Sequence, residues 1–212
     1  MTSRLTKTTG IYLITPETDD TDYLCGIVEH LLKQPVALLQ YRHKGLDSVL
    51  KHRQAEALLA IAHAADVPLI INDDWSLALA IDADGVHLGQ SDDDPAMVRR
   101  YLGENKLIGV SCYNDFNKAE CMAAIDVDYL AFGAVFASPT KPLAGKAALS
   151  LFQQAKRLGK PTVAIGGITP DNCSQLHDAG ADFIAVISGV FDAPDPASAL
   201  AAYIQSFTKA SP

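Results

Sequence analysis

An amide and two cationic side chains stand at alternate positions in one short segment of the sequence. Gln40, Arg42 and Lys44 are each separated by one residue in the run Gln40-Tyr41-Arg42-His43-Lys44. If this run is extended, alternate side chains point to the same side, so the three polar groups can converge. A guanidinium and an ammonium group on one face are suited to binding a phosphate or a diphosphate. The alternative interpretation is that these residues form a basic strand end that is exposed to solvent and binds no ligand.

Carboxylates follow two consecutive apolar runs farther along the chain. Asp73 follows the first run and Asp92 follows the second. Carboxylates at neighbouring strand ends can bind Mg²⁺, which takes a few protein oxygens and completes its shell with water and phosphate oxygens. The nearby Asp74 is predicted to cap the next helix. Asp93 and Asp94 precede Pro95 and favour another helix N-terminus, so Asp73 and Asp92 are the preferred metal ligands.

His87 lies between these two carboxylates in the sequence, and strand alternation directs it inward. It can be interpreted as a proton shuttle, as a substrate contact or as a core histidine that is hydrogen-bonded within the protein. The core histidine is the default interpretation.

Small and hydroxyl-bearing residues mark the remaining candidate positions. Ser111 ends a fifth apolar run, and a Pro-bounded loop carries two hydroxyls and a lysine that suit a phosphate or an ordinary turn; these are Ser138, Thr140 and Lys141. Gly167 follows the seventh run, and Ile187 and Ser188 close the eighth. Glycine lets backbone N–H groups approach a phosphate closely. One cationic and acidic region and one neutral region favour a transferase that releases diphosphate and binds a second, monophosphorylated substrate.

The elements that must position these residues alternate regularly along the chain. Short apolar runs, as expected of parallel strands buried on both faces, are separated by stretches of helical periodicity. We expect one helix to start at Thr169, with Pro170 in its first turn, and to stop at Gly180. The eight predicted strands are 11–15, 36–41, 68–72, 85–88, 107–111, 129–133, 162–165 and 183–187.

Eight such units over 212 residues leave roughly 26 residues each, which is typical of a compact (β/α)₈ barrel. An open doubly wound sheet is the alternative, but no G-x-G-x-x-G turn follows the first strand. No linker divides the chain, so we predict an α/β fold, a single TIM barrel domain over residues 1–212. The active site of such a barrel lies at the C-terminal ends of its strands.

Net charge, hydropathy and cysteine spacing limit the classes of partner and the cellular location that we expect. The formal net charge of −8 argues against nucleic acid and against an anionic membrane surface, so any phosphate must meet a local cationic cluster. No apolar run reaches the length of a membrane span, and the N-terminus lacks the apolar core of a secretion signal. The four cysteines form no C-x-x-C pair, which favours a cytoplasmic location.

Together, seven stretches of the chain resemble the thiamine-phosphate synthase family, also called thiamine-phosphate pyrophosphorylase. They occur in the family's order over about residues 11 to 190, and their joint spacing is specific. The stretches are 40–44, 71–73, 85–92, 108–111, 138–141, 163–168 and 185–188.

The resemblance implies an Mg²⁺-dependent transferase that joins an aminopyrimidine methyl diphosphate to a thiazole phosphate. It implies that diphosphate departs first and that the thiazole nitrogen captures the remaining pyrimidine methyl cation. Asp73 and Asp92 would bind Mg²⁺, while Arg42, Lys44 and Lys141 would stabilise the departing diphosphate. The implied pyrimidine diphosphate site comprises Gln40, Tyr41, Arg42, His43, Lys44, Asn72, Ser111 and Lys141. The implied thiazole phosphate site comprises Ser138, Thr140, Gly167, Ile187 and Ser188.

Two rival functions remain open at this point. A related thiazole tautomerase barrel would need no diphosphate site, and a non-catalytic barrel that senses thiamine phosphates would need no metal pair. The retained Asp73, Asp92, Arg42, Lys44 and Lys141 argue against both. A lid formed by residues 138–147 and a homo-oligomeric state are further expectations that the sequence leaves open.

Overall fold

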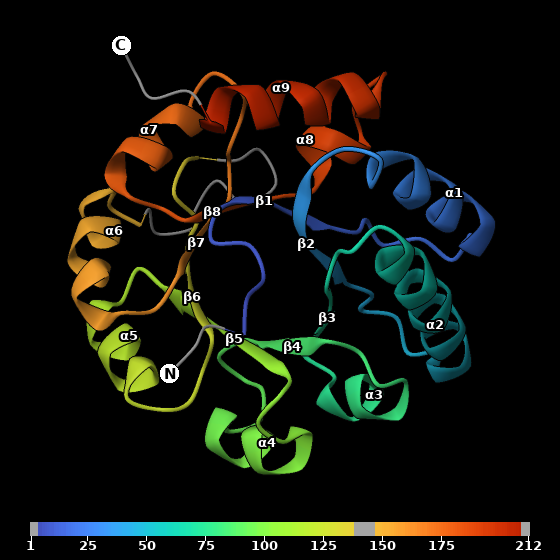
Figure 1. Cartoon of the computed structure of the whole chain (residues 1–212), viewed down its shortest axis with the longest axis horizontal. Coiled ribbons are helices and arrows are strands. Elements are labelled where there is room, and N and C mark those ends of the chain that lie inside the picture. The colour runs from blue at the N-terminus through green and yellow to red at the C-terminus, as the bar shows by residue number, and fades with distance from the viewer. Residues whose placement is uncertain (1–3, 138–146, 209–212) are drawn as a thin grey trace.

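Eight parallel strands close into a barrel in the computed structural model, which describes residues 4–137 and 147–208 (Figure 1). The strands pair in chain order, and β8 pairs with β1. The predicted (β/α)₈ barrel is therefore confirmed, and the open doubly wound sheet is excluded. The strands are β1 (Gly10–Ile14), β2 (Val36–Tyr41), β3 (Leu69–Asn72), β4 (Gly85–Leu88), β5 (Leu107–Tyr113), β6 (Tyr129–Gly133), β7 (Thr162–Ile165) and β8 (Phe183–Val186).

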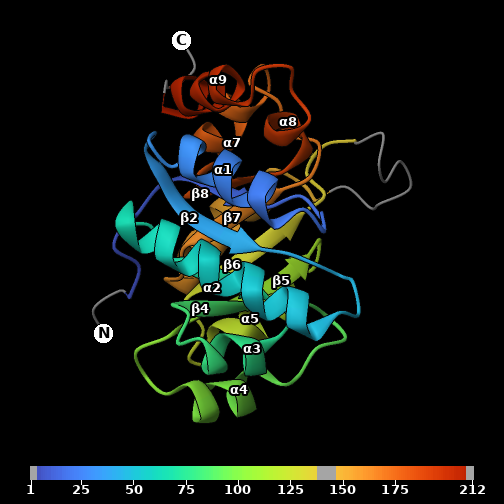
Figure 2. The same ribbon diagram turned by 90° about the vertical axis from the view of Figure 1, so that its right-hand side faces the viewer.

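Helices cover the outside of this ring, and Figure 2 shows α1 and α2 side by side against it. They are α1 (Thr21–Leu31), α2 (Ser48–Ala64), α3 (Trp75–Ala80), α4 (Pro95–Leu102), α5 (Phe116–Ala123), α6 (Ser150–Ala155), the 3₁₀ turn η1 (Lys156–Leu158), α7 (Cys173–Ala179), α8 (Ser188–Phe191) and α9 (Pro196–Thr208). The longest, α2, has 17 residues, and no helix in the described ranges has the length and hydropathy of a membrane span.

Strand alternation divides the core into two layers. One layer fills the space between the strands and the helices, and the other fills the barrel interior. The interior layer contains Tyr12 and Tyr129, and both side chains are almost fully buried. Gly109 on the neighbouring strand makes room for Tyr129, because a Cβ at position 109 would lie 1.9 Å from the tyrosine ring.

Aspartate side chains form hydrogen bonds between strands at the N-terminal end of the barrel, opposite the predicted site. Each stands just before an even-numbered strand and accepts a hydrogen bond from a backbone N–H of the preceding strand. Asp84 accepts from Leu69 of β3, Asp128 from Ile108 of β5, and Asp182 from Thr162 of β7, each at 2.7 Å. Arg4 and Arg99 also form ion pairs with Asp128, each at 2.7 Å. The polar groups at this end are therefore engaged in hydrogen bonds and ion pairs within the protein.

The predicted start of the seventh helix was wrong. Residues Thr169–Asn172 form a turn, in which the side chain of Asn172 accepts a hydrogen bond from the N–H of Thr169, and α7 begins only at Cys173. The turn competes with the cap for the same polar groups, as Asn side chains often do. The predicted stop at Gly180 is confirmed, since this residue ends α7 with a φ of 90°.

Candidate active site

Because all eight strands are parallel, their C-terminal ends bring residues that are distant in sequence to one end of the barrel. Gln40 pairs in register with Ile14, the last residue of β1, and with Ile70, the second residue of β3. Asn72 pairs in register with His87. Gln40 is 2% exposed, and its amide points into the barrel, where it donates to the hydroxyl of Tyr12. Closure of the parallel barrel places the C-terminal ends of these strands at one end of the molecule.

The ammonium group of Lys44 forms an ion pair with the carboxylate of Asp73. The two residues follow neighbouring strands, β2 and β3. Arg42 lies nearby in sequence, and its Nη1 is 3.9 Å from Oε2 of Glu17. The Arg42 side chain is 35% exposed, and a guanidinium in that position can receive an anion.

Tyr41 and His43 have a different orientation from Gln40, as alternation requires. The Tyr41 hydroxyl donates a 2.9 Å hydrogen bond to Gln54 of α2, and burial raises the pKa of Tyr41 above its ordinary value. The His43 ring lies 3.1 Å from a carboxylate oxygen of Asp19. Tyr41 and His43 also line one pocket together with Lys44 and Asp73. Tyr41 therefore faces α2, and both side chains border the pocket that Lys44 and Asp73 share.

The carboxylates of Asp73 and Asp92 converge. Asp73 has a φ of 63°, and its backbone N–H donates to the carbonyl oxygen of His87 at 2.8 Å, which draws it toward β4. Asp92 accepts a 2.5 Å hydrogen bond from the N–H of Gly89. Burial, and after it the neighbouring carboxylate of Asp73, raises the pKa of Asp92. Two carboxylates this close, with the pKa of Asp92 raised, form a site that a cation would stabilise.

This donor set suits Mg²⁺. No group of three or more His, Cys, Asp or Glu residues able to hold a metal occurs in the part of the chain that the structure describes. A structural zinc site would need such a group. Mg²⁺ instead is commonly held by one or two carboxylates, with water and substrate phosphates supplying the other oxygens. The pair Asp73 and Asp92 fits an ion that is shared with a phosphorylated substrate.

Asp74 and Asp94 lie at helix N-termini, as predicted. The side chain of Asp74 accepts from the N–H of Leu77 and caps α3, and Asp94 caps α4. Asp93 instead accepts a 2.6 Å hydrogen bond from the indole of Trp75. These hydrogen bonds distinguish the three aspartates from the predicted metal pair, Asp73 and Asp92.

His87 is a core histidine with two partners, in agreement with the default interpretation. Its Nδ1 lies 3.2 Å from the hydroxyl of Tyr129, and its Nε2 lies 2.9 Å from the hydroxyl of Ser111. Burial lowers its pKa from an ordinary value of 6.5 to about 4. The imidazole is therefore neutral at physiological pH, with one donor and one acceptor nitrogen.

Gly167, Ile187 and Ser188 lie at the ends of two adjacent strands. Gly167 follows β7 with a φ of 67°, Ile187 follows β8, and Ser188 begins the short helix α8. Many barrels bind phosphate on the loops after these two strands, beside a short helix. Three residues predicted for the site, Ser138, Thr140 and Lys141, lie outside the described residues, as does nearly all of the predicted lid.

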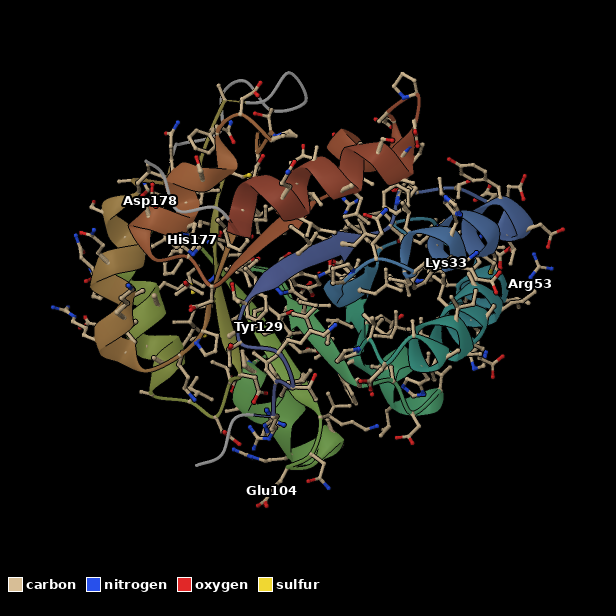
Figure 3. All side chains as sticks on the ribbon, turned by 45° about the horizontal axis from the view of Figure 1, so that its top comes forward. Lys33, Arg53, Glu104, Tyr129, His177 and Asp178 are labelled. Atoms are coloured by element: carbon tan, nitrogen blue, oxygen red, sulfur yellow. The ribbon has the colours of Figure 1, made fainter. Side chains whose placement is uncertain are left out.

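Two residues of the site region were not predicted. Tyr12 and Tyr129 connect Gln40 to His87 through their hydroxyls inside the barrel. Figure 3 labels Tyr129 and shows it near the centre of the ring of strands. Their inward direction could have been read from strand alternation, but their mutual contact joins strands that are not neighbours.

A closed barrel with cations, a carboxylate pair and a glycine-containing turn at its C-terminal end defines a TIM barrel enzyme of phosphorylated substrates. The sequence model of one family, described as thiamine monophosphate synthase, matches residues 11–190. The chain belongs to this family, which confirms the resemblance and the predicted enzyme class.

Curated relatives agree along nearly the whole chain. Thiamine-phosphate synthase of Aromatoleum aromaticum is 51% identical over 93% of this chain and 96% of its own length. The protein of the same name from Xanthomonas campestris pv. campestris is 48% identical over 94% and 96%. Among solved structures, thiamine phosphate pyrophosphorylase from Pyrococcus furiosus is 28% identical, covers 96% of each chain and has a TM-score of 0.84.

Proposed function

We propose that this chain synthesises thiamine phosphate from 4-amino-2-methyl-5-(diphosphooxymethyl)pyrimidine and 4-methyl-5-(2-phosphooxyethyl)thiazole. The C–O bond to the diphosphate breaks, and its electron pair leaves with the diphosphate oxygen. The lone pair of the thiazole nitrogen then forms the new C–N bond to the pyrimidine methylene carbon, and pyrophosphate is released. The observation that carries the proposal is the convergence of Lys44, Asp73 and Asp92 at the C-terminal end of a barrel of this family.

Asp73 and Asp92 would hold Mg²⁺. When bound, the ion supplies charge neutralisation for the departing diphosphate and helps to orient it. Arg42 and Lys44 provide further positive charge from the end of β2, and Lys141 is proposed to add to it. Such charges accelerate the reaction because the negative charge on the leaving group grows as the bond breaks.

The remaining predicted residues would bind the two organic substrates. Gln40, Asn72 and Ser111 would hold the pyrimidine, while Tyr41 and His43 would support the wall beside its diphosphate. The thiazole phosphate would bind to Ser138, Thr140, Gly167, Ile187 and Ser188. A pyrimidine methyl cation needs no enzymic nucleophile, but it does need protection from water.

The alternatives predict different behaviour. A thiazole tautomerase would convert thiazole phosphate isomers without any diphosphate substrate, and a sensor would bind thiamine phosphate without turnover. The ion pair of Lys44 with Asp73, next to Asp92, favours the synthase, because neither alternative uses a diphosphate-binding cluster.

Measurement of pyrophosphate release and of thiamine phosphate by mass spectrometry tests the proposal. Both products should appear in equal amounts, and only when both substrates and Mg²⁺ are present. Thiazole isomerisation without pyrophosphate would identify the tautomerase, and binding without either product would identify the sensor. The cytoplasmic location, the absence of nucleic-acid and membrane partners and a homo-oligomeric state remain predictions beside this function.

A further inference from the structure

Five side chains form a continuous hydrogen-bonded chain through the barrel interior. It begins at Gln40, whose Nε2 lies 2.7 Å from the hydroxyl of Tyr12, which in turn lies 2.7 Å from the hydroxyl of Tyr129. It continues over 3.2 Å to Nδ1 of His87 and ends with 2.9 Å from Nε2 of His87 to Ser111. The chain therefore links two predicted pyrimidine contacts on β2 and β5 through three residues that contact neither diphosphate nor metal in the proposal.

The chain has a direction. The Nε2 of Gln40 donates to Tyr12, so the Tyr12 proton is free to point onward. Tyr12 is 1% exposed, and a buried hydroxyl proton without an acceptor would be costly, so Tyr12 donates to Tyr129. By the same reasoning Tyr129, which is fully buried, donates to Nδ1 of His87. The proton of the neutral imidazole then resides on Nε2 and is donated to Ser111.

The packing around the chain holds this arrangement in place. The rings of Tyr12 and Tyr129 meet edge to face at a centroid distance of 5.8 Å, and the rings of His87 and Tyr129 stack at 5.7 Å. Gly109 leaves the space that the Tyr129 ring occupies. Rotation of either ring would lose these contacts as well as a hydrogen bond, so the packing holds the five groups at hydrogen-bonding distance before a ligand arrives.

We propose that Tyr12, Tyr129 and His87 are positioning residues that set the hydrogen-bonding polarity of the pyrimidine site, which rests on the function proposed above. Ser111 already accepts from His87, so its own proton is directed to the substrate. Gln40 donates an amide N–H to Tyr12, and its amide oxygen remains available as an acceptor. The site therefore selects a heterocycle that offers a ring-nitrogen lone pair to Ser111 and an N–H donor to Gln40, and an aminopyrimidine carries both groups.

The tautomer of His87 tests the direction in the wild-type protein. ¹⁵N NMR at neutral pH, with the His87 signals identified by their loss in His87→Gln, should show the proton on Nε2. A proton on Nδ1 would reverse every step of the chain and overturn the proposal. This measurement needs no substrate, so its failure is distinct from the failure of the proposed function, which would appear as absence of pyrophosphate release.

Kinetics of Tyr129→Phe test the consequence. The variant removes the donor to Nδ1 and frees the imidazole to adopt the other tautomer, in which Ser111 donates to His87 and no longer to the substrate. KM for the pyrimidine diphosphate should rise about tenfold, as for one to two hydrogen bonds, while KM for the thiazole phosphate stays unchanged. The His87 signal should at the same time shift toward a mixture of tautomers.

Tyr203→Phe is the matched control. Tyr203 is 1% exposed and donates a single 2.8 Å hydrogen bond, to the carbonyl of Ile168, but it is outside the chain. This variant should leave the His87 tautomer and the pyrimidine KM unchanged. Equal rises in the pyrimidine KM for Tyr129→Phe and Tyr203→Phe, or no rise for Tyr129→Phe, would contradict the positioning role.

Discussion

The ammonium group of Lys44 is paired with the carboxylate of Asp73, so the end of β2 is joined electrostatically to the end of β3. Asp92 approaches the same carboxylate, and its pKa is raised by burial and then by Asp73. The carboxylate of Asp73 therefore lies between the ammonium group of Lys44 and the carboxylate of Asp92. This arrangement makes Asp73 the residue on which charge balance in the site depends.

Replacement of Asp73 by Ala should lower pyrophosphate release by more than about 100-fold, because metal-assisted charge neutralisation contributes several kcal/mol. The fold should remain intact, as judged by circular dichroism. Asp74→Ala is the neighbouring control: it should lose about 1 kcal/mol of stability with its helix cap and keep its Mg²⁺ dependence. Near-normal turnover by the wild type at saturating substrates with EDTA present would exclude the metal role.

Arg42→Ala should reduce kcat by roughly 100-fold, because the guanidinium stabilises charge that develops only as the diphosphate departs. Single-turnover measurement of pyrophosphate release separates this chemical step from substrate binding. An Arg42→Ala variant in which only the KM for the thiazole phosphate increased would contradict the assignment of Arg42 to the diphosphate.

Gly167 has a packing constraint that the sequence did not reveal. Its φ is 67°, and a Cβ at this position would lie 2.5 Å from the carbonyl oxygen of Phe136 and 2.7 Å from that of Ala137. Gly167→Val should therefore lower the melting temperature as well as weaken thiazole phosphate binding. It should affect pyrimidine diphosphate binding little, and thermal unfolding with calorimetry on each substrate measures the two effects separately.

Ser188→Ala tests the same phosphate site without that backbone strain. It removes one hydroxyl and leaves the backbone N–H groups in place, so the loss in thiazole phosphate binding should be about 1 kcal/mol. Isothermal titration calorimetry measures it, with the pyrimidine diphosphate as the unaffected ligand. If the loss fell on the pyrimidine diphosphate instead, the two sites would have been assigned in the wrong order.

His87 should make the protein sensitive to mild acid. Burial lowers its folded-state pKa to about 4, below the ordinary 6.5, so the unfolded chain binds this proton more readily. The contribution of neutral, buried His87 to the free energy of unfolding is fully present above pH 6.5. It falls by on the order of 3 kcal/mol as the pH decreases toward 4. Urea unfolding of wild type, His87→Gln and the exposed-site control His52→Gln across this range measures the slope. Only His87→Gln should have a shallower slope than wild type.

The barrel was predictable because its parallel strands are apolar on both faces. The predicted limits of β2, β4, β6 and β7 agree with the structure, and the other four differ by at most two residues at an end. The start of α7 was missed because Asn172 bonds to the N–H of Thr169 in a turn, a local competition that Thr169-Pro170 does not disclose.

The site was predictable to the extent that strand ends define it. Alternation grouped Gln40 with Arg42 and Lys44, and helix-capping rules separated Asp74 from Asp73. The contact between Tyr12 and Tyr129 could not be predicted, because it crosses the barrel between β1 and β6 and depends on the space left by Gly109. Within an apolar strand, a tyrosine that packs and a tyrosine that relays a hydrogen bond have the same sequence pattern.

The aspartates at the N-terminal end of the barrel bear on how the chain assembles. Asp84, Asp128 and Asp182 bond to backbone N–H groups only 15 to 20 residues earlier in the sequence. Each bond closes a strand–helix–strand unit without help from distant parts of the chain, and short loops close at low entropic cost. The six strands from β3 to β8 can thus form as three local pairs. Neighbouring pairs then join in chain order, and ring closure remains as the late, long-range event, at the seam where β8 meets β1.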